Sequence, residues 1–175
     1  MFNQTHTPIE VSVCSLNVNR SNTATHAAMH VIREKTDPPF NLLLIQEPWW
    51  EKLHNRQATV SFPGWQVILL KSQIIENERP CVTGYYRQGG HLEVTLRTNI
   101  LSDLNIMILE TKRTGDPSNP TRIINTYNQK QLGEQNENIF TIDHLTRIHL
   151  NLEIPTIITG DWNTCHPKWD DSIEQ

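Results

Sequence analysis

The chain has 175 residues, of which 37% are hydrophobic and 19% charged, a composition that excludes collagen-like, low-complexity and charge-rich disordered proteins. The length predicts a single folded domain. The formal net charge of -4 gives no global attraction to nucleic acid or to acidic membranes, so a nucleic-acid partner would need a local basic face or a metal ion.

The sequence also lacks membrane, secretion and metal-knuckle signals. No apolar run approaches the roughly 20 residues of a membrane-spanning helix, and the N-terminal residues do not form a secretory signal. The widely spaced Cys14, Cys81 and Cys165 indicate neither a disulfide framework nor a zinc knuckle. We therefore expect an intracellular protein without membrane contact, with residues 1–8 as a tail and 9–175 as one domain.

The first third of the chain predicts a β-α-β unit. The run 9–18 alternates as a strand does, and residues 21–23 are preferred N-cap types for a helix that Asp37-Pro38-Pro39 ends. Residues 41–47 are nearly all apolar, which is typical of a strand covered on both faces. The apolar stripe expected on the helix is Ala24, Ala27, Ala28, Val31 and Ile32.

The rest of the chain is predicted to be rich in strands. Five runs bounded by turn residues are 65–70, 81–87, 91–97, 105–111 and 121–127. Gln88-Gly89-Gly90 predicts a hairpin turn, residues 134–152 a helix, and residues 155–160 another buried strand. Two β-α-β-like ends that flank antiparallel strands predict a layered α/β fold.

Polar side chains follow three of the predicted strands. Asn17 and Asn19 follow the first, Gln46 and Glu47 the second, and 161–163 the last. Ligands in open α/β sheets collect at the carboxyl ends of strands. These side chains are therefore expected to converge on one pocket.

A cation is expected where the two acids meet. If Glu47 and Asp161 approach to about 6 Å, their repulsion is roughly 3 kcal/mol at an effective dielectric constant near 20. A hard divalent cation such as Mg²⁺ relieves that repulsion and takes only one or two carboxylates, leaving its other positions to water and phosphate. The neutral Asn17, Asn19 and Asn163 can orient water or phosphate without adding charge.

Four segments carry a resemblance to a known family. They are S-L-N-V-N-R-S (15–21), L-L-L-I-Q-E-P-W-W (42–50), I-I-N-T-Y-N (123–128) and I-I-T-G-D-W-N-T-C-H-P-K-W-D (157–170). Together they resemble the endonuclease/exonuclease/phosphatase superfamily, most closely the apurinic-like endonuclease domain of non-LTR (LINE-type) retrotransposons. The specific part is Q-E-P-W combined with G-D-W-N and a following H-P-x-W, and the likeness runs from Val11 to Asp170.

The resemblance implies a fold, a reaction and partners. The fold is a four-layer α/β sandwich of the DNase I-like type, and the reaction is hydrolysis of DNA phosphodiesters with Mg²⁺ or Mn²⁺. The partners are DNA and a reverse transcriptase domain in the full-length protein, which would place it in the nucleus. The family ends with an [S/T]-D-H motif, and this chain stops at Gln175 before it, so the domain is expected to lack its last strands.

The resemblance also implies roles for five residues. Glu47 matches the metal-binding glutamate, and Asn17 matches the asparagine beside the metal and the scissile phosphate. Asp161 matches the aspartate that orients or deprotonates the attacking water, with Asn163 as its companion. Tyr127 matches the tyrosine that steadies the phosphate.

Some positions depart from the family pattern. Asn19 stands where many relatives have an acid, which would weaken or relocate a second metal. After Tyr127 the usual Y-x-P-N becomes Y-N-Q-K, which leaves open whether Asn128 or Lys130 takes the role of the amide. The residues expected to contact nucleic acid are Arg20, Asn19, His166 and Trp169.

Other patterns in the sequence are interpreted as structural. Asp143-His144 resembles the [S/T]-D-H motif, but it precedes G-D-W-N and lies in the predicted helix, so we assign it to the surface or to packing. His26 and His30 lie one helical turn apart without a third ligand, which favours an exposed helix face over a zinc site. Trp65 is assigned to the core. Either packing or base stacking suits the tryptophans near the predicted site, which are Trp49, Trp50, Trp162 and Trp169.

Three hypotheses for function follow. The first is the N-terminal, larger part of a retrotransposon-type endonuclease that nicks DNA. The second is a catalytically inactive remnant that at most binds metal or nucleic acid. The third is a phosphoesterase that acts on small substrates. The H-P-K-W segment (166–169) favours the retrotransposon hypothesis over this third one.

Overall fold

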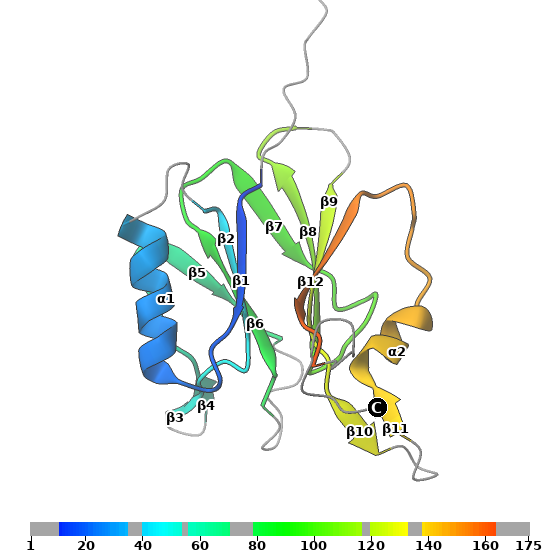
Figure 1. Ribbon diagram of the computed structural model, residues 1–175. Coiled ribbons are helices and arrows are strands. Elements are labelled where there is room, and N and C mark those ends of the chain that lie inside the picture. The colour runs from blue at the N-terminus through cyan, green and yellow to red at the C-terminus, as the bar shows by residue number, and fades with distance from the viewer. Residues whose placement is uncertain are drawn as a thin grey trace, which may run out of the picture.

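The computed structural model describes residues 11–34, 40–53, 56–70, 79–116, 120–132 and 138–163. Two four-stranded sheets pack face to face (Figure 1). The first sheet contains, in spatial order, β1 (Val13–Asn17), β2 (Leu42–Gln46), β6 (Val82–Arg87) and β5 (Trp65–Ile68). The second contains β12 (Thr156–Asp161), β9 (Thr121–Tyr127), β8 (Ile106–Arg113) and β7 (Leu92–Leu96). The predicted α/β class is confirmed.

Two helices and two short ribbons complete the described structure. The helices are α1 (Asn22–Glu34) and α2 (Thr141–Thr146). The ribbons pair β3 (Glu51–Leu53) with β4 (Arg56–Ala58), and β10 (Lys130–Leu132) with β11 (Asn138–Phe140). No helix in the described ranges is long and apolar enough to cross a membrane.

The predicted β-α-β opening is present. Strands β1 and β2 are parallel, and α1 connects them. Ser21 caps the helix, because its hydroxyl accepts a hydrogen bond from the backbone N–H of Ala24 at 3.1 Å. The buried stripe differs from the predicted one, since Thr25, Met29 and Ile32 are buried while Val31 is 46% exposed. The long Met29 side chain, rather than the alanines, fills the space above the sheet.

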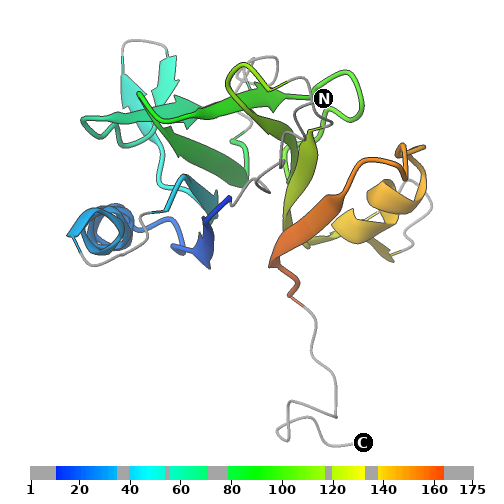
Figure 2. The same cartoon turned by 90° about the horizontal axis from the view of Figure 1, so that it is seen from above.

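The core lies in two layers on either side of β2. Since side chains alternate along a strand, Leu42 and Leu44 face the second sheet, while Leu43 and Ile45 face α1. Every residue of β2 is therefore buried, as the apolar run predicts. A third cluster, on the outer face of the second sheet, is covered by the 100–101 loop, α2 and the segment after it. Figure 2 shows α2 on the side of the second sheet that faces away from the first.

The turn at Gln88-Gly89-Gly90 does not form a hairpin, which corrects the prediction. The turn leads from β6 to β7, and these strands belong to different sheets. Both edges of β6 are already occupied, by β2 and by β5, so β7 pairs with β8 instead. Local turn chemistry specifies a reversal, whereas strand pairing depends on which edges are free.

The helix predicted over 134–152 is also wrong in extent. Residues 138–140 pair with β10 as a strand, and the helix occupies only Thr141–Thr146. Asp143 fixes the helix start by accepting a hydrogen bond from the backbone N–H of Phe140 at 2.9 Å. Leu152, which the helical stripe would bury, is 94% exposed.

The last described strand, β12, is an edge strand rather than a buried one. It pairs on one side only, with β9, and in parallel register. Ile157 and Ile158 are 49% and 45% exposed, although consecutive residues of a strand face opposite ways. The predicted strand is confirmed, and its predicted burial is wrong.

Candidate active site

The predicted site residues meet at the carboxyl ends of four strands. In the parallel pairs β1–β2 and β9–β12, the last paired residues are Asn17 with Gln46 and Tyr127 with Asp161. The edge strands β1 and β12 belong to different sheets but lie side by side (Figures 1 and 2). The same ends of both sheets therefore project their polar side chains into one region.

Asn17 joins the two acids. Its Nδ2 donates hydrogen bonds to Glu47 Oε2 at 3.0 Å and to Asp161 Oδ2 at 2.7 Å. The two carboxylate oxygens are thus no farther apart than the sum of these distances. Asn17 Oδ1 accepts a hydrogen bond from the backbone N–H of Asn19 at 2.6 Å, which points the amide nitrogen at the acids. Glu47 and Asp161 therefore converge as the strand ends predicted.

The negative charge of this cluster is only partly balanced. Arg20 Nε lies 3.5 Å from Glu47 Oε1, and the Arg20 side chain is 69% exposed. An ion pair this exposed contributes about 0 to 1 kcal/mol, because water screens it. Among the residues that the structure describes, one solvated cation faces two carboxylates, which leaves the cluster with an excess of negative charge.

The backbone around the cluster is strained. The non-glycine residues with positive φ in the described ranges are Asn19 (48°), Arg20 (54°), Glu47 (48°) and Asn163 (44°), all at this site. Such conformations cost roughly 1 kcal/mol or more each and persist where the surrounding structure holds them. Two of the restraints are bonds from Arg20 N to Glu47 O at 2.7 Å and from Asn163 N to Asp161 Oδ1 at 3.0 Å.

Gly160 allows β12 to approach β9 beside the catalytic candidate Asp161. Its φ is 143°, and a Cβ added there would lie 1.9 Å from the carbonyl oxygen of Thr126. Only glycine fits this close approach without displacing a strand. The G-D pair of the sequence motif is thereby explained by packing as well as by chemistry.

Tyr127 carries a protonated hydroxyl at this site. Burial raises the pKa of Tyr127, a hydrogen bond from Asn163 lowers it, and the charge of Glu47 together with a hydrogen bond to that carboxylate raises it again. The net direction is upward, so the phenol stays neutral and can donate a hydrogen bond at neutral pH. The structure brings Tyr127, Asn163 and Glu47 together.

Asn128 anchors the end of β9. It is almost fully buried, its Nδ2 donates to the carbonyl oxygen of Trp162 at 2.7 Å, and its Oδ1 accepts from Ile142 N at 3.1 Å. Its own backbone N–H bonds to the Asp161 carbonyl oxygen at 2.8 Å. Both side-chain atoms bond backbone groups, so Asn128 positions the Asp161 segment. Lys130 is described for its backbone alone.

A buried polar layer lies beneath the acids, and of its members the sequence singled out Gln46 but not Ser15 or Asn125. Gln46 Nε2 donates to Ser15 Oγ at 3.0 Å and to Asn125 Oδ1, while Asn125 Nδ2 donates to the carbonyl oxygens of Ile45 and Thr83, both at 3.2 Å. These bonds connect the two sheets directly and so fix the spacing of the carboxylates above them. The signal in the sequence is an amide inside the apolar run I-I-N-T-Y.

The remaining predicted residues lie in different environments. Asn19 and Arg20 form the exposed turn after β1, beside the acids. His166 and Trp169 lie outside the described residues. His144 pairs with Asp103 at 2.6 Å rather than with the acids, which fits its predicted packing role.

The histidines of α1 do not share a ligand. The ring of His26 packs edge-on against Phe62, with centroids 5.3 Å apart, and His30 pairs with Glu34 at 3.1 Å. Within the described ranges, no group of three or more His, Cys, Asp or Glu side chains is placed to hold a metal. The donors at the candidate site are two carboxylates and neutral amides, an oxygen-rich set that fits a hard cation which keeps several waters.

A pocket of about 440 Å³ adjoins the site and shares Glu47 with it. The residues that line it are Arg20, Glu47, Pro48, Trp49, Trp50, Arg79, Pro80 and Cys81. Burial raises the pKa of the Cys81 thiol, Arg20 lowers it, and Glu47 and Asp103 raise it, so the thiol stays protonated. Arg79 and Cys81 were not predicted as site residues, because no motif marks them.

Compared with models of protein families, with curated proteins and with solved structures, the chain matches none. Function is therefore inferred from the geometry of the chain's own residues.

Proposed function

We propose that this protein is a metal-dependent phosphodiesterase that nicks DNA, of the endonuclease/exonuclease/phosphatase type found in LINE-like retrotransposons. One observation carries the proposal: Asn17 bonds both Glu47, 30 residues away, and Asp161, 144 residues away. The two face-to-face sheets, with α1 outside one and α2 outside the other, support the DNase I-like four-layer sandwich.

Glu47 and Asp161 would hold the cation, Mg²⁺ or Mn²⁺, because their excess negative charge faces a partly exposed region. In the structure the Asn17 amide nitrogen donates a hydrogen bond to each carboxylate and so lies between the two acids, where a cation would be attracted to both. When bound, the cation would stabilise negative charge on the phosphoryl oxygens and on the leaving 3′-oxygen.

Asp161 is the proposed base or orienting group for the attacking water. Its oxygens are held by Asn17 and by the backbone N–H of Asn163, yet each carboxylate oxygen retains a lone pair that can accept a proton or a water hydrogen bond. The two bonds fix the side chain in one orientation, which is the requirement for positioning water.

Neutral donors would bind the phosphate. The raised pKa of Tyr127 keeps its hydroxyl protonated, so it can donate to a phosphoryl oxygen. The exposed Asn19 amide and the Arg20 guanidinium lie beside the acids and add two further donors. Together with His166 and Trp169, these residues would supply the local attraction to DNA that the net charge of -4 does not.

Nicking of supercoiled plasmid DNA tests the proposal. We expect relaxation that requires Mg²⁺ or Mn²⁺, stops in EDTA, and falls on the order of 100-fold or more in Glu47→Ala and Asp161→Ala. Glu93→Ala is a matched control, because Glu93 is an exposed acid paired with Lys112 on the second sheet. Nicking that survives both site substitutions would reject the proposed site.

One observation favours a second candidate function. Within the described ranges, His144 pairs with Asp103, and no histidine joins Glu47 and Asp161 to stabilise charge on a reacting phosphate. A protein that binds metal or nucleic acid without turnover would give no metal-dependent nicking at high protein concentration, yet would still bind DNA. Activity on p-nitrophenyl phosphate but not on plasmid would instead indicate a phosphoesterase for small substrates.

A further inference from the structure

The pocket beside the acids has the size of a site for one small ligand. Its volume of about 440 Å³ lies within the roughly 300 to 1,000 Å³ typical of ligand sites, which accommodates one nucleotide but not a duplex. It shares Glu47 with the candidate active site, so a ligand in the pocket would lie next to a phosphate bound there.

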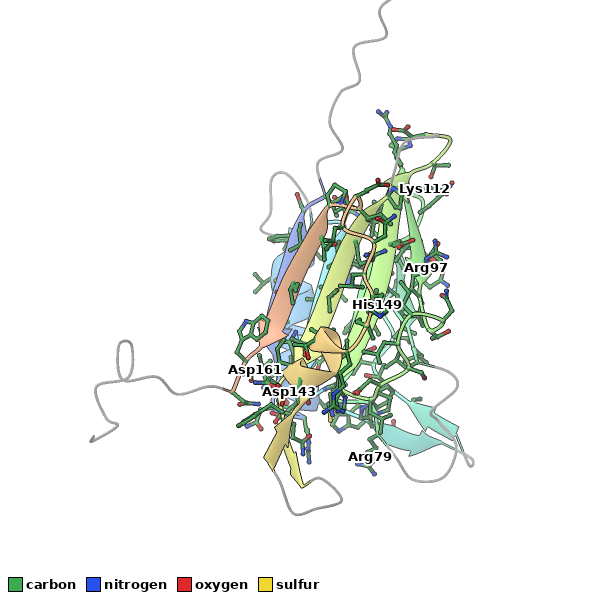
Figure 3. The ribbon with its side chains drawn as sticks, turned by 90° about the vertical axis from the view of Figure 1, so that its right-hand side faces the viewer. Arg79, Arg97, Lys112, Asp143, His149 and Asp161 are labelled. Atoms are coloured by element: carbon green, nitrogen blue, oxygen red, sulfur yellow. The ribbon has the colours of Figure 1, made fainter. Side chains whose placement is uncertain are left out.

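Two guanidinium groups line this pocket. Arg20 is within 3.5 Å of Glu47, whereas Arg79 forms no ion pair with the described residues and is exposed. Figure 3 shows Arg79 at the same lower end of the molecule as Asp161, while Lys112 lies at the opposite end. A guanidinium binds phosphate through two parallel N–H bonds, so Arg79 is suited to an anionic group that enters the pocket.

The two tryptophans of the pocket differ in what they can do. Trp50 is 9% exposed, and its Nε1 donates to the Pro80 carbonyl oxygen at 2.9 Å, so it forms part of the packed wall. Trp49 is partly exposed, and its backbone carbonyl accepts a hydrogen bond from Thr59 Oγ1 at 2.8 Å. Trp49 lines the pocket, and this bond restrains its backbone, so its partly exposed side chain is available to a ligand. A planar base is the natural counterpart of such a ring.

We propose that this pocket binds one nucleotide of the DNA strand that crosses the acids, with its phosphate on Arg79 and its base against Trp49. The placement next to the scissile phosphate rests on the proposed function. The same chemistry, a phosphate with an attached base, is also present in a free mononucleotide, so the test includes both.

Equilibrium binding in EDTA tests the pocket without requiring catalysis. The probe is a short fluorescent single-stranded DNA oligonucleotide, measured by anisotropy. We expect Trp49→Ala and Arg79→Gln each to weaken binding about ten-fold, and Trp49→Phe to retain most of the affinity because it keeps an aromatic face. The matched control is Arg87→Gln, which removes the same charge from the exposed far end of β6. Equal losses in Arg79→Gln and Arg87→Gln would overturn the proposal.

Oligonucleotides that lack one base, scanned along the strand, locate the contact. At one position, loss of the base should weaken binding to the wild type as much as Trp49→Ala does, and the two losses should not add. Additive losses at every position would refute the base contact. If dAMP competes as strongly as the oligonucleotide, the pocket is a mononucleotide site, and the strand assignment is wrong.

The two proposals fail separately. Absence of metal-dependent nicking, with Trp49- and Arg79-dependent binding intact, would reject the nuclease and keep the nucleotide pocket. Unchanged binding by Trp49→Ala and Arg79→Gln, with nicking intact, would reject the pocket alone. Both substitutions are at partly or fully exposed positions, and their thermal melts should match that of the wild type.

Discussion

Two clusters of charged residues in this molecule have opposite charge balance. On the second sheet, Glu110 lies between Arg122 Nη2, 2.8 Å from its Oε1, and Arg97 Nε, 2.6 Å from its Oε2. Glu110 and Arg122 are 6% and 2% exposed. At the candidate active site, Glu47 pairs with the exposed Arg20, and no cation among the described residues pairs with Asp161. One cluster has two cations for one acid, and the other has two acids for one cation.

The difference separates a cluster whose acid is fully paired from one whose acids can still bind a cation. Burial alone would raise the pKa of Glu110, but hydrogen bonds from Arg122 and Arg97 lower it below its usual value. Both oxygens of Glu110 are occupied by the protein. The oxygens of Glu47 and Asp161 are held by neutral amides and by one solvated arginine, so they can still take a cation or a proton. Charge balance, not residue type, marks the candidate site.

The largest effect on stability is expected from breaking the cluster of Glu110, Arg122 and Arg97. Glu110→Ala should destabilise the fold by about 3 to 5 kcal/mol, because it leaves Arg122 buried and unpaired. Urea unfolding measures the change. Glu93→Ala, which removes an exposed acid paired with Lys112, should cost no more than about 1 kcal/mol. Equal costs would mean that burial does not govern this cluster.

Neutralising one acid of the candidate active site should affect activity rather than stability. Asp161→Asn keeps the size of the side chain while removing its charge, and its single amide oxygen can accept only one of the two hydrogen bonds that Asp161 takes from Asn17 and Asn163. We expect nicking to fall on the order of 100- to 1000-fold. Without metal, the stability of the fold should change by no more than about 1 kcal/mol, since the loss of one hydrogen bond is offset by the loss of the repulsion from Glu47. Plasmid nicking and a thermal melt in EDTA measure the two quantities. A large loss of stability would instead give Asp161 a structural role.

Metal binding at Glu47 and Asp161 should stabilise the fold even if no reaction occurs. A cation at a hundred-fold excess over its Kd adds about 2.7 kcal/mol to the free energy of unfolding. We expect Mg²⁺ to raise the melting temperature of the wild type and of Glu93→Gln, but not that of Glu47→Gln. An equal rise in all three proteins would indicate binding elsewhere.

The pH dependence of stability should reflect the lowered pKa of Glu110 in its cluster with Arg122 and Arg97. A carboxyl whose pKa is lower in the folded than in the unfolded state stabilises the fold above its unfolded pKa, and this contribution is lost as the pH falls through the folded pKa. The pKa of Glu110 is lowered on folding. The stability advantage of the wild type over Glu110→Gln should therefore be full at neutral pH and shrink below about pH 4. Urea titrations at several pH values test this; a constant difference would contradict it.

The sequence by itself determined the elements with strong local signals and the residues of the candidate site. The Ser21 cap begins α1, which ends at Glu34, and the apolar run of β2 specifies a strand buried on both faces. The polar residues at strand ends were expected to converge, and Asn17 does join Glu47 and Asp161. The helix cap and the buried strand follow from capping and periodicity, which are local properties, whereas the convergence follows from the β-α-β topology, which brings the carboxyl ends of parallel strands to one edge of a sheet.

Only the tertiary structure decided which edges and faces are occupied. β6 pairs on both sides, so β7 joins the other sheet, and β12 ends that sheet with Ile157 and Ile158 half exposed. The bonds of Asn125 to β2 and β6 and the pocket formed by Trp49 and Arg79 join segments that are far apart in the chain. The neighbours of these residues depend on how distant strands pack. A local sequence pattern specifies a helix or a strand, but it does not specify which other element packs against it.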